Sequence, residues 1–330
     1  MKALRIVTIP FLLAFGSSGC AAGSCPSAKK PVHIDTRDDV MSVLSDNSPL
    51  LRYSFTDKAS KPYILELFTP AGYNVLRDAP ADHIHHHGLM FAVSVDGTSF
   101  WTERSDSGRQ LHRRFGDVGL KNNGDTICPG FTEHLDWLGP DGKKLLNEIR
   151  TIRLCQLTDG PATLLTWQTR LELPKGASYA DLDGAHYYGL GMRFLEWMDA
   201  VGCFRNAAGK PGEIFRGDER LAGSKWCAYS AELDEGPVTV AMFDHPENPR
   251  PVTWFTMSKP FAYLAATMAL HSEPLRITAE KPLTLRYAVA LWDRHIDSEK
   301  IDALCNDWLR RPLQEAGPGQ TQKPKQKMQK

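Results

Sequence analysis

Four histidines stand within five positions of this 330-residue chain, at His83, His85, His86 and His87. Neutral imidazole is a common metal ligand and the side chain best suited to move protons near neutral pH. If the segment is extended, His83, His85 and His87 point to one side of the strand and His86 to the other. Same-side imidazoles can hold zinc or another divalent metal. The sequence therefore predicts a catalytic or metal-binding turn, with solvated or structural histidines as the alternative.

A second group of polar side chains follows an apolar run that ends at Phe243. Asp244, His245 and Asn248 share their loop with three prolines, which restrict φ and make the loop rigid. We expect His245 to act as an acid opposite the histidine turn, with Asn248 and Asp244 orienting a substrate. The alternative is that Asp244 and Asn248 only close the turn through side-chain to backbone hydrogen bonds.

Arg193 stands in an apolar run and needs a charged partner, either a carboxylate of the fold or an anionic group of a substrate. His186 and Tyr188 precede it and either stack on a sugar ring or pack in the core. Glu103 and Glu133 are the carboxylates we would test for acid or base catalysis. A solvated position on a strand is the alternative for each of them.

Composition excludes several classes of protein. Lys and Arg number 39 and balance 39 Asp and Glu, so no basic surface for nucleic acid is predicted. The sequence has no Gly-x-Ser-x-Gly elbow, phosphate-binding loop or His-Glu-x-x-His zinc helix. The cysteines show no Cys-x-x-Cys pair, and one or two disulfides of undetermined pairing remain open.

The elements that must position these residues are mainly strands. Apolar and polar residues alternate in runs such as 63–68, 89–95 and 149–157, with Gly, Pro and Asp turns between them. This pattern predicts antiparallel sheets. One amphipathic helix is expected after Asp297 or Ser298, its apolar stripe packing onto the sheets. The predicted fold is all-β, a large antiparallel β-sandwich with a C-terminal helix, and the histidine turn lies where a core strand begins.

The N-terminus has the pattern of a signal peptide. Two positive charges precede the apolar run from Ile6 to Phe15, which is too short to cross a bilayer, since that takes roughly 20 residues. Small residues then lead to Cys20, which favours lipidation at this cysteine, with ordinary cleavage near Ala22 as the alternative. We therefore expect an exported protein, periplasmic or anchored to the outer membrane, that touches a membrane only through its lipid.

The predicted organisation has four parts. A signal peptide of residues 1–22 is followed by a linker of residues 23–45. The β-sandwich domain covers residues 46–312, and residues 313–330 form a basic tail with almost no apolar content. Such a tail buries too little surface to offset its ordering entropy.

The segment from His83 to Phe91, followed by Gly97, Phe100 and Trp101, resembles the signature of a bacterial family of uncharacterised proteins often labelled "methane oxygenase PmoA". The sequence departs from the family at His87, where arginine is usual. The resemblance spans roughly residues 60 to 295 and rests on these further segments: Trp137–Gly142, Gly191–Arg193, Trp226 with Tyr229, Phe243–Arg250, Thr253–Phe255 and Pro282–Tyr287.

The resemblance implies a fold similar to the galactose mutarotase-like supersandwich, which presents such side chains to carbohydrate on a concave sheet. The membrane label does not fit, because the mature chain has no apolar run of about 20 residues. The leading prediction is an exported carbohydrate-active enzyme, a lyase, epimerase or hydrolase, acting on a sugar or glycan. The alternatives are a non-catalytic glycan-binding or scaffold lipoprotein and a soluble metal-dependent oxygenase.

In that leading prediction the cofactor, if there is one, is a divalent metal. The expected catalytic residues are His85, His86, Arg193, His245, Glu103 and Glu133; the expected substrate-binding residues are Asn248, Asp244, His186, Tyr188 and Trp226; the metal ligands would be His83, His85 and His87.

Overall fold

The computed structural model describes residues 31–123, 126–199, 201–234 and 236–311. The predicted signal peptide, Cys20 and the basic tail from residue 313 lie outside these residues. The described residues belong to one compact unit. Within them, no helix combines the length and apolar character that a membrane span requires.

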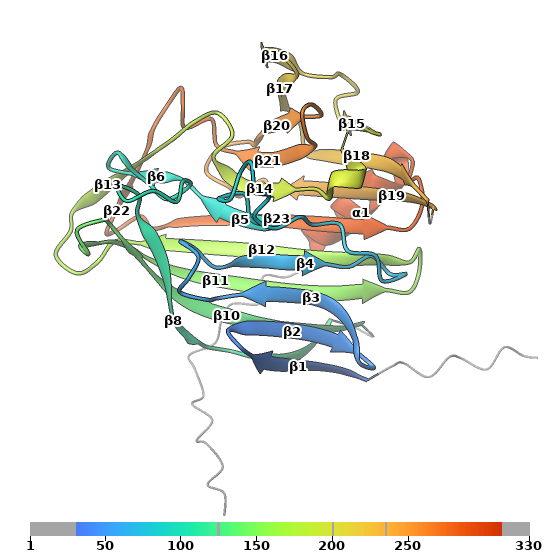
Figure 1. Ribbon diagram of the computed structural model, residues 1–330, viewed down its shortest axis with the longest axis horizontal. Helices are drawn as coiled ribbons and strands as arrows, with labels where there is room; N and C mark the ends of the chain where they lie inside the picture. Colours follow the sequence, from blue (N-terminus) through green and yellow to red (C-terminus); the bar gives the residue numbers. More distant parts are fainter. Residues whose placement is uncertain (1–30, 124–125, 200, 235, 312–330) are drawn as a thin grey trace, which may run out of the picture. The chain divides into compact units, whose positions relative to one another are not determined.

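The first of two large sheets has ten strands, and every neighbouring pair in it is antiparallel (Figure 1). Three of its central strands are β5 (Leu89–Ala92), which follows the histidine turn, β14 (Gly189–Arg193), which ends at Arg193, and β21 (Tyr263–Thr267). In spatial order the strands are β1 (Val32–Arg37), β2 (Val40–Ser45), β3 (Ser48–Ser54), β4 (Tyr63–Leu67), β5 (Leu89–Ala92), β14 (Gly189–Arg193), β21 (Tyr263–Thr267), β20 (Thr253–Met257), β17 (Glu219–Gly223) and β16 (Glu213–Arg216).

The second large sheet has nine strands, and its long strands β10 (Thr126–Leu138), β11 (Lys144–Leu157) and β12 (Ala162–Glu172) pair in register over most of their length. A disulfide between Cys128 and Cys155 links β10 to β11. The strands are β15 (Gly202–Asn206), β18 (Trp226–Leu233), β19 (Gly236–Asp244), β23 (Leu283–Trp292), β12 (Ala162–Glu172), β11 (Lys144–Leu157), β10 (Thr126–Leu138) and β8 (Arg109–Phe115), with β9 (Gly119–Asn123) also pairing with β10. A small sheet contains β22 (Leu275–Thr278), β13 (Tyr179–Asp183), β6 (Ser94–Val95) and β7 (Thr98–Ser99).

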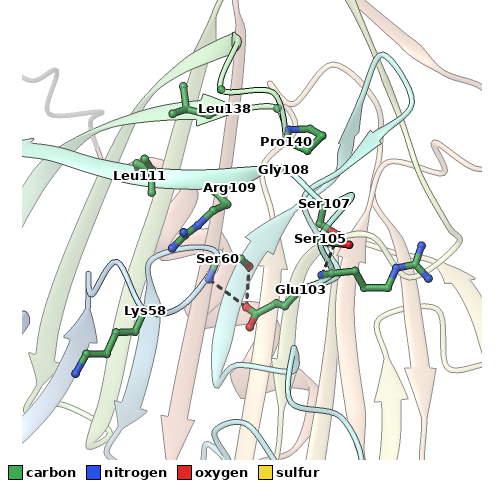
Figure 2. A pocket seen from close by; sticks show the side chains of 13 residues that line it. Lys58, Ser60, Glu103, Ser105, Ser107, Gly108, Arg109, Leu111, Leu138 and Pro140 are labelled. Carbon is green, nitrogen blue, oxygen red and sulfur yellow. Dashed lines mark hydrogen bonds between the residues drawn. The ribbon is translucent and has the colours of Figure 1, made fainter.

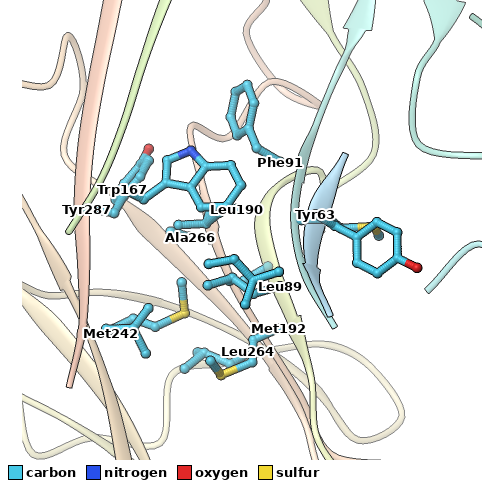
Figure 3. Close-up of a cluster of buried hydrophobic side chains, with 14 of the residues drawn as sticks. Tyr63, Leu89, Phe91, Trp167, Leu190, Met192, Met242, Leu264, Ala266 and Tyr287 are labelled. Atoms are coloured by element: carbon cyan, nitrogen blue, oxygen red, sulfur yellow. The ribbon is translucent and has the colours of Figure 1, made fainter. Parts of the chain in front are cut away.

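The main core lies between the two large sheets. Along β14, Leu190 and Met192 belong to this core, so the alternation of a strand turns Gly191 and Arg193 to the opposite, outer face. Figure 3 shows Leu190 and Met192 in the same apolar cluster as Trp167 and Tyr287 of the nine-stranded sheet. The sandwich core therefore sets which side chains of the first sheet point outward.

The helix α1 (Ser298–Arg310) begins where the sequence predicts. Asp297 caps it by accepting a hydrogen bond from the backbone N–H of Lys300 at 2.8 Å. Its buried residues Ile301, Cys305 and Trp308 join a second apolar cluster on β18, β19, β12 and β23. The predicted fold class is confirmed: an all-β, antiparallel sandwich with one helix at its C-terminal end.

The N-terminal boundary differs from the prediction, because β1 and β2 lie inside the expected linker of residues 23–45. Met41 and Val43 of β2 are buried in the core. The two tight hairpin turns contain Asp38 and Asp39, then Asp46 and Asn47, all with positive φ. Asp and Asn tolerate this conformation. Because these turns contain no Gly or Pro, the sequence pattern did not indicate the two short strands beside them.

Candidate functional site

The histidine turn is folded rather than extended. The backbone N–H of His83 donates to the carbonyl of Pro80 at 2.8 Å, and that of His86 donates to the carbonyl of His83 at 2.9 Å. These consecutive turns place His83 and His86 together, with ring centroids 4.6 Å apart and nearly parallel. The expectation that His83, His85 and His87 share one side is wrong, because it assumed the two-residue period of a strand.

His87 is held between two carboxylates. Its Nδ1 lies 2.7 Å from Oδ1 of Asp78 and its Nε2 lies 2.8 Å from Oε1 of Glu103. Ionised carboxylates only accept hydrogen bonds, so both ring nitrogens donate and the ring is an imidazolium. Burial alone would lower the pKa of His87, but the hydrogen bonds to Asp78 and Glu103 outweigh it and raise the pKa.

This arrangement bears on the predicted metal ligands. An imidazolium with both nitrogens occupied has no lone pair for a metal ion, so His83, His85 and His87 do not form a ligand set as placed. Across the described ranges, no group of three or more His, Cys, Asp or Glu side chains is arranged to hold a metal ion.

Glu103 is tied in place from several sides. Its Oε1 accepts hydrogen bonds from Ser60 Oγ at 2.7 Å, Lys61 Nζ at 3.2 Å and His87 Nε2 at 2.8 Å, and Figure 2 shows Glu103 against Ser60. Burial alone would raise the pKa of Glu103, but His87 and Lys61 outweigh it and hold the pKa well below its usual range. Glu103 is therefore a fixed carboxylate and not a ready proton donor.

The outer face of the first sheet carries a cluster that we call the outer-face cluster: His86, Trp101, Arg193 and Tyr263. Arg193 of β14 and Tyr263 of β21 are register neighbours. The ring of His86 lies 5.3 Å from that of Tyr263 and 6.2 Å from that of Trp101. Gly191 makes room for them, because a Cβ there would lie 2.0 Å from Oη of Tyr263.

Each member of the outer-face cluster buries a polar atom that has no hydrogen-bond partner among the residues that the structure describes. These atoms are Nδ1 of His86, Nε1 of Trp101, Nε of Arg193 and Oη of Tyr263. Buried polar atoms in folded proteins almost always have a partner, because leaving one unpaired costs about 1–3 kcal/mol. Four such atoms from four chain segments in one cluster indicate a place built for an external partner.

Arg193 is only partly satisfied by the fold. Its Nη1 and Nη2 approach the Asp199 carboxylate at 3.5 and 3.4 Å, and Nη1 also reaches the carbonyl of Ala262 at 3.3 Å. Its guanidinium carbon lies 3.7 Å from the centre of the Phe261 ring. The fold thus supplies the predicted carboxylate through long contacts and leaves Nε unpaired.

The charge states within the site differ among its histidines. Burial, followed by the nearby His85 and His83, lowers the pKa of His86 to about 2, so its ring is neutral at ordinary pH. Burial, followed by Lys61, also lowers the pKa of the half-buried His85. Burial raises the pKa of Tyr263 well above its ordinary value, so the phenol keeps its proton.

Two of the predicted substrate-binding residues lie next to the outer-face cluster. Tyr188 stacks on Trp101, with ring centroids 4.9 Å apart and an angle of 10° between the planes. His186 lies beyond Tyr187 from the outer-face cluster. Its Nε2 is 3.0 Å from Oε2 of Glu219 and its ring stacks on Phe215. Tyr187 contacts the rings of both His186 and Trp101.

The loop after β19 lies in another part of the fold. Nε2 of His245 accepts from Nη1 of Arg286 at 3.0 Å, and the His245 ring packs edge-on against Trp308 of α1. Asn248 donates to Asp244 at 2.7 Å and also bonds the backbone of Arg286. These contacts close the turn and leave His245 on the helix-covered sheet, so it does not stand opposite the histidine turn.

Two further candidates are structural in their contacts. Trp226 is buried and donates from Nε1 to Asp302 of α1. Glu133 is fully buried between the sheets, where it accepts from Tyr53 and contacts Nδ1 of His112 at 2.6 Å. Glu133 and Glu103 therefore have separate sets of partners and do not face each other across a common site.

Sequence reasoning missed Tyr263 and Phe261 of the site. The available signal was the aromatic alternation Phe261-Ala262-Tyr263 at the start of a strand, which is equally typical of a core strand. Asp78 and Lys61, which hold His87 and Glu103, gave no signal because their partners lie nine and 42 positions away.

A family model described as "Family of unknown function (DUF6807)" matches residues 40–306. None of the curated proteins matches the chain. The resemblance to proteins labelled PmoA is not tested by these matches and stays a prediction.

Several solved structures are similar to the chain at low identity. An α-galactosidase from Lactobacillus brevis has a TM-score of 0.43 and 6% identity over 80% of this chain and 40% of its own. The galactosidase domain of an α-galactosidase–sucrose kinase has a TM-score of 0.47 and 7% identity over 80% and 42%. An α-galactosidase from Geobacillus stearothermophilus has a TM-score of 0.43 and 8% identity over 80% and 41%. The chain thus spans about two fifths of the length of these structures.

Proposed function

The chain belongs to the family of unknown function DUF6807, and for this member we propose that the outer-face cluster binds a sugar and acts on it by acid–base chemistry. The observation that carries the proposal is the set of four buried, unpaired polar atoms on His86, Trp101, Arg193 and Tyr263. Sugar hydroxyls both donate and accept hydrogen bonds, and the apolar face of a sugar ring packs on aromatic side chains. A sugar therefore matches both the polar atoms and the aromatic rings of the site.

The site chemistry favours removal of a proton next to a carbonyl or carboxylate group. Arg193 is permanently charged and Tyr263 keeps its phenolic proton, so both can stabilise negative charge that develops on a substrate oxygen. His85, whose ring lies 4.6 Å from that of His86, is the base, because the pKa of His86 is too low for it to hold a proton. The neutral His86 then serves as a hydrogen-bonding partner.

Two reaction types follow from this arrangement. In an elimination, His85 takes the proton from carbon, the electron pair forms a carbon–carbon double bond, and the neighbouring carbon–oxygen bond breaks with its electrons going to the leaving oxygen. In an epimerisation, a proton from water adds to the other face of the same carbon, and His85 releases the proton that it took to solvent. Hydrolysis by a pair of carboxylates is less favoured, because Glu103 and Glu133 do not face each other.

The test is a saccharide panel of neutral and acidic mono- and oligosaccharides. Binding would be measured by isothermal titration calorimetry and turnover by NMR, for the wild type, His85→Ala and His86→Ala. We expect His85→Ala to lower turnover by about 10²- to 10⁴-fold, the range for loss of a general base. His295→Ala is the matched control, since His295 is an exposed histidine paired with Glu232 outside the site.

Three outcomes separate the possibilities. Turnover lost in His85→Ala with unchanged unfolding supports an acid–base enzyme. Binding without turnover in the wild type, lowered by Trp101→Ala, supports the alternative of a non-catalytic glycan-binding protein. Absence of binding by every saccharide in the panel would overturn the proposal.

We also propose that the protein is exported and lipid-anchored. The Cys128–Cys155 disulfide supports this, since disulfides persist mainly in oxidising compartments. Cell fractionation of the wild type and Cys20→Ser tests the anchor: the wild type should sediment with membranes and the variant should move to the periplasmic fraction. Recovery of both proteins in the cytoplasm would contradict export.

A further inference from the structure

A cavity of about 480 Å³ lies beside Glu103, within the size range of small-molecule sites. Its walls come from the chain around residues 58–60, from residues 103–109 and from the turn between β10 and β11. Figure 2 shows Leu138 and Pro140 of that turn across from Ser60 and Glu103. The turn belongs to the Trp137–Gly142 segment, whose motif has no part in the outer-face cluster.

Glu103 connects the cavity with the histidine turn. Its Oε1 accepts all of its hydrogen bonds from Ser60, Lys61 and His87, and among the described residues none donates to Oε2. Oε2 is thus free to accept a hydrogen bond from a ligand hydroxyl. The imidazolium of His87 and the ammonium of Lys61 balance the charges of two carboxylates, Glu103 and Asp78, so Glu103 does not make the cavity negative.

The other charged side chains that line the cavity are cations: Lys58, Arg104 and Arg109. Arg104 pairs with Asp106 at 3.2 Å, but both side chains are about 70% exposed, and exposed pairs are weak. Arg109 donates from Nη2 to the carbonyls of Asp57 and Ala59; no hydrogen bond from its Nε or Nη1 is found within the described part of the chain. Cationic donors that are free or weakly held favour an anionic ligand.

We infer that this cavity binds the carboxylate or sulfate of an acidic sugar, which makes the substrate of the neighbouring site an acidic oligosaccharide. The inference rests on the proposed function, because it treats the two places as parts of one binding site. Trp101 of the outer-face cluster and Glu103 of the cavity are two residues apart, at most about 7 Å along the chain. Lys58 and Arg104 at the rim attract the anionic group, Glu103 accepts a hydrogen bond from a hydroxyl, and Leu138 and Pro140 contact the apolar face of the sugar.

The test compares glucuronate, glucose 6-sulfate and glucose by isothermal titration calorimetry. We expect wild type to bind at least one acidic sugar more tightly than glucose, and the better of the two identifies carboxylate or sulfate as the anion. Lys58→Gln/Arg104→Gln should weaken the binding of that acidic sugar about tenfold and leave the affinity for glucose unchanged. Lys175→Gln/Arg294→Gln removes the same charge at exposed positions outside the cavity and should change neither.

A second variant separates the shape of the cavity from its charge. Ser105 is exposed and lines the cavity, so Ser105→Trp fills the space without altering charge or the buried fold. This variant should also weaken the binding of acidic sugars about tenfold, with the free energy of unfolding unchanged. Equal affinities for acidic sugars and glucose, or acidic-sugar affinity unaffected by both variants, would overturn the inference.

Arg193→Met distinguishes this inference from the proposed function. If Arg193→Met leaves acidic-sugar affinity unchanged while Lys58→Gln/Arg104→Gln lowers it, the cavity binds the anion and the outer-face cluster is not the sugar site. If only Arg193→Met lowers affinity, the proposed function holds and the cavity has no part in it.

Discussion

Two buried arginines of this protein have opposite surroundings. Arg150, between the sheets, uses all five N–H donors: Glu148 accepts at 2.8 and 2.9 Å, Gln110 at 2.9 Å, Tyr53 at 3.0 Å and the carbonyl of Pro62 at 2.8 Å. Arg193, on the outer face, makes three contacts of 3.3–3.5 Å and leaves Nε unpaired. Both residues are at most 1% exposed, so burial alone does not distinguish them.

The difference indicates separate roles for the two residues. Burial alone would lower the pKa of Arg150, but Glu148 and Tyr53 outweigh it and raise the pKa. Burial lowers the pKa of Arg193, and Asp199 does not compensate fully. Other arginines also leave Nε unpaired, namely Arg153, Arg205 and Arg286. Arg193 differs from them because its unpaired Nε belongs to the outer-face cluster, whose three other members also bury unpaired polar atoms, and this combination points to an external partner.

The largest expected effect is on stability, at Arg150. Arg150→Met leaves Glu148 buried without its cation, and breaking such a pair costs about 3–5 kcal/mol. The free energy of unfolding from urea titration measures this loss. Arg170→Met is the matched control on the neighbouring strand, where the pair with Glu172 is about 40% exposed and should cost less than about 1 kcal/mol. A loss at Arg150 no larger than at Arg170 would remove the contrast between the two arginines.

The second effect is on binding, at Arg193. Arg193→Met removes a charged hydrogen bond to the ligand, so we expect an affinity loss of about 2 kcal/mol, or roughly thirtyfold. Its stability should fall by only about 1.5 kcal/mol, because Asp199 keeps its 2.7 Å hydrogen bond from the N–H of Ala262. Calorimetry with the tightest saccharide of the panel measures the first quantity. A stability loss like that of Arg150→Met, with unchanged affinity, would make Arg193 a structural residue.

The third effect is steric, at Gly191. A Cβ there would lie 2.0 Å from Oη of Tyr263 and 3.1 Å from the Trp101 ring, so Gly191→Ala should displace both side chains of the outer-face cluster. We expect about tenfold weaker saccharide binding and a stability loss of about 1–3 kcal/mol from overpacking. Gly223→Ala is the control, since a Cβ at Gly223 of β17 meets nothing within 4 Å. Equal effects of the two substitutions would show that the close contact at Gly191 has no functional part.

Much of the fold was predictable because alternation and turn residues are local signals. The strands beginning at Tyr63 and Leu89, and the helix capped by Asp297, all form where the pattern indicates. The strands β1 and β2 were missed because their alternation is short and their turns use Asp and Asn in place of Gly.

The site was predictable only in its residue types. His86 and Arg193 stand out as unusual in their segments, and the structure brings them together through Tyr263. The expected partner His245 has equally suggestive neighbours in the sequence, yet its contacts are with Arg286 and Trp308. Which outer face a loop joins depends on strand order across the sheets, and local sequence does not encode that order.

The smallest expected effect is on the pH dependence of stability, at His87. Both ring nitrogens of His87 are paired, in contrast to the unpaired residues of the outer-face cluster. The pKa of His87 is raised in the folded protein, so its contribution to stability is fully present below its ordinary pKa of about 6.5 and is lost as the pH rises through the folded pKa. The stability advantage of wild type over His87→Gln should therefore shrink as the pH rises above about 6.5 and through the folded pKa of His87.

Titration of Glu103 does not overlap with the pH range in which the contribution of His87 to stability is lost. Its pKa is lowered, so its contribution is lost only as the pH falls below about 4.3 toward the folded value. Urea titrations of both proteins across the pH range give the measurement, with His295→Gln as an exposed control. A wild-type advantage that stays constant or grows with pH would mean that His87 is neutral, with one ring nitrogen free, and the turn would again be open to a metal ion.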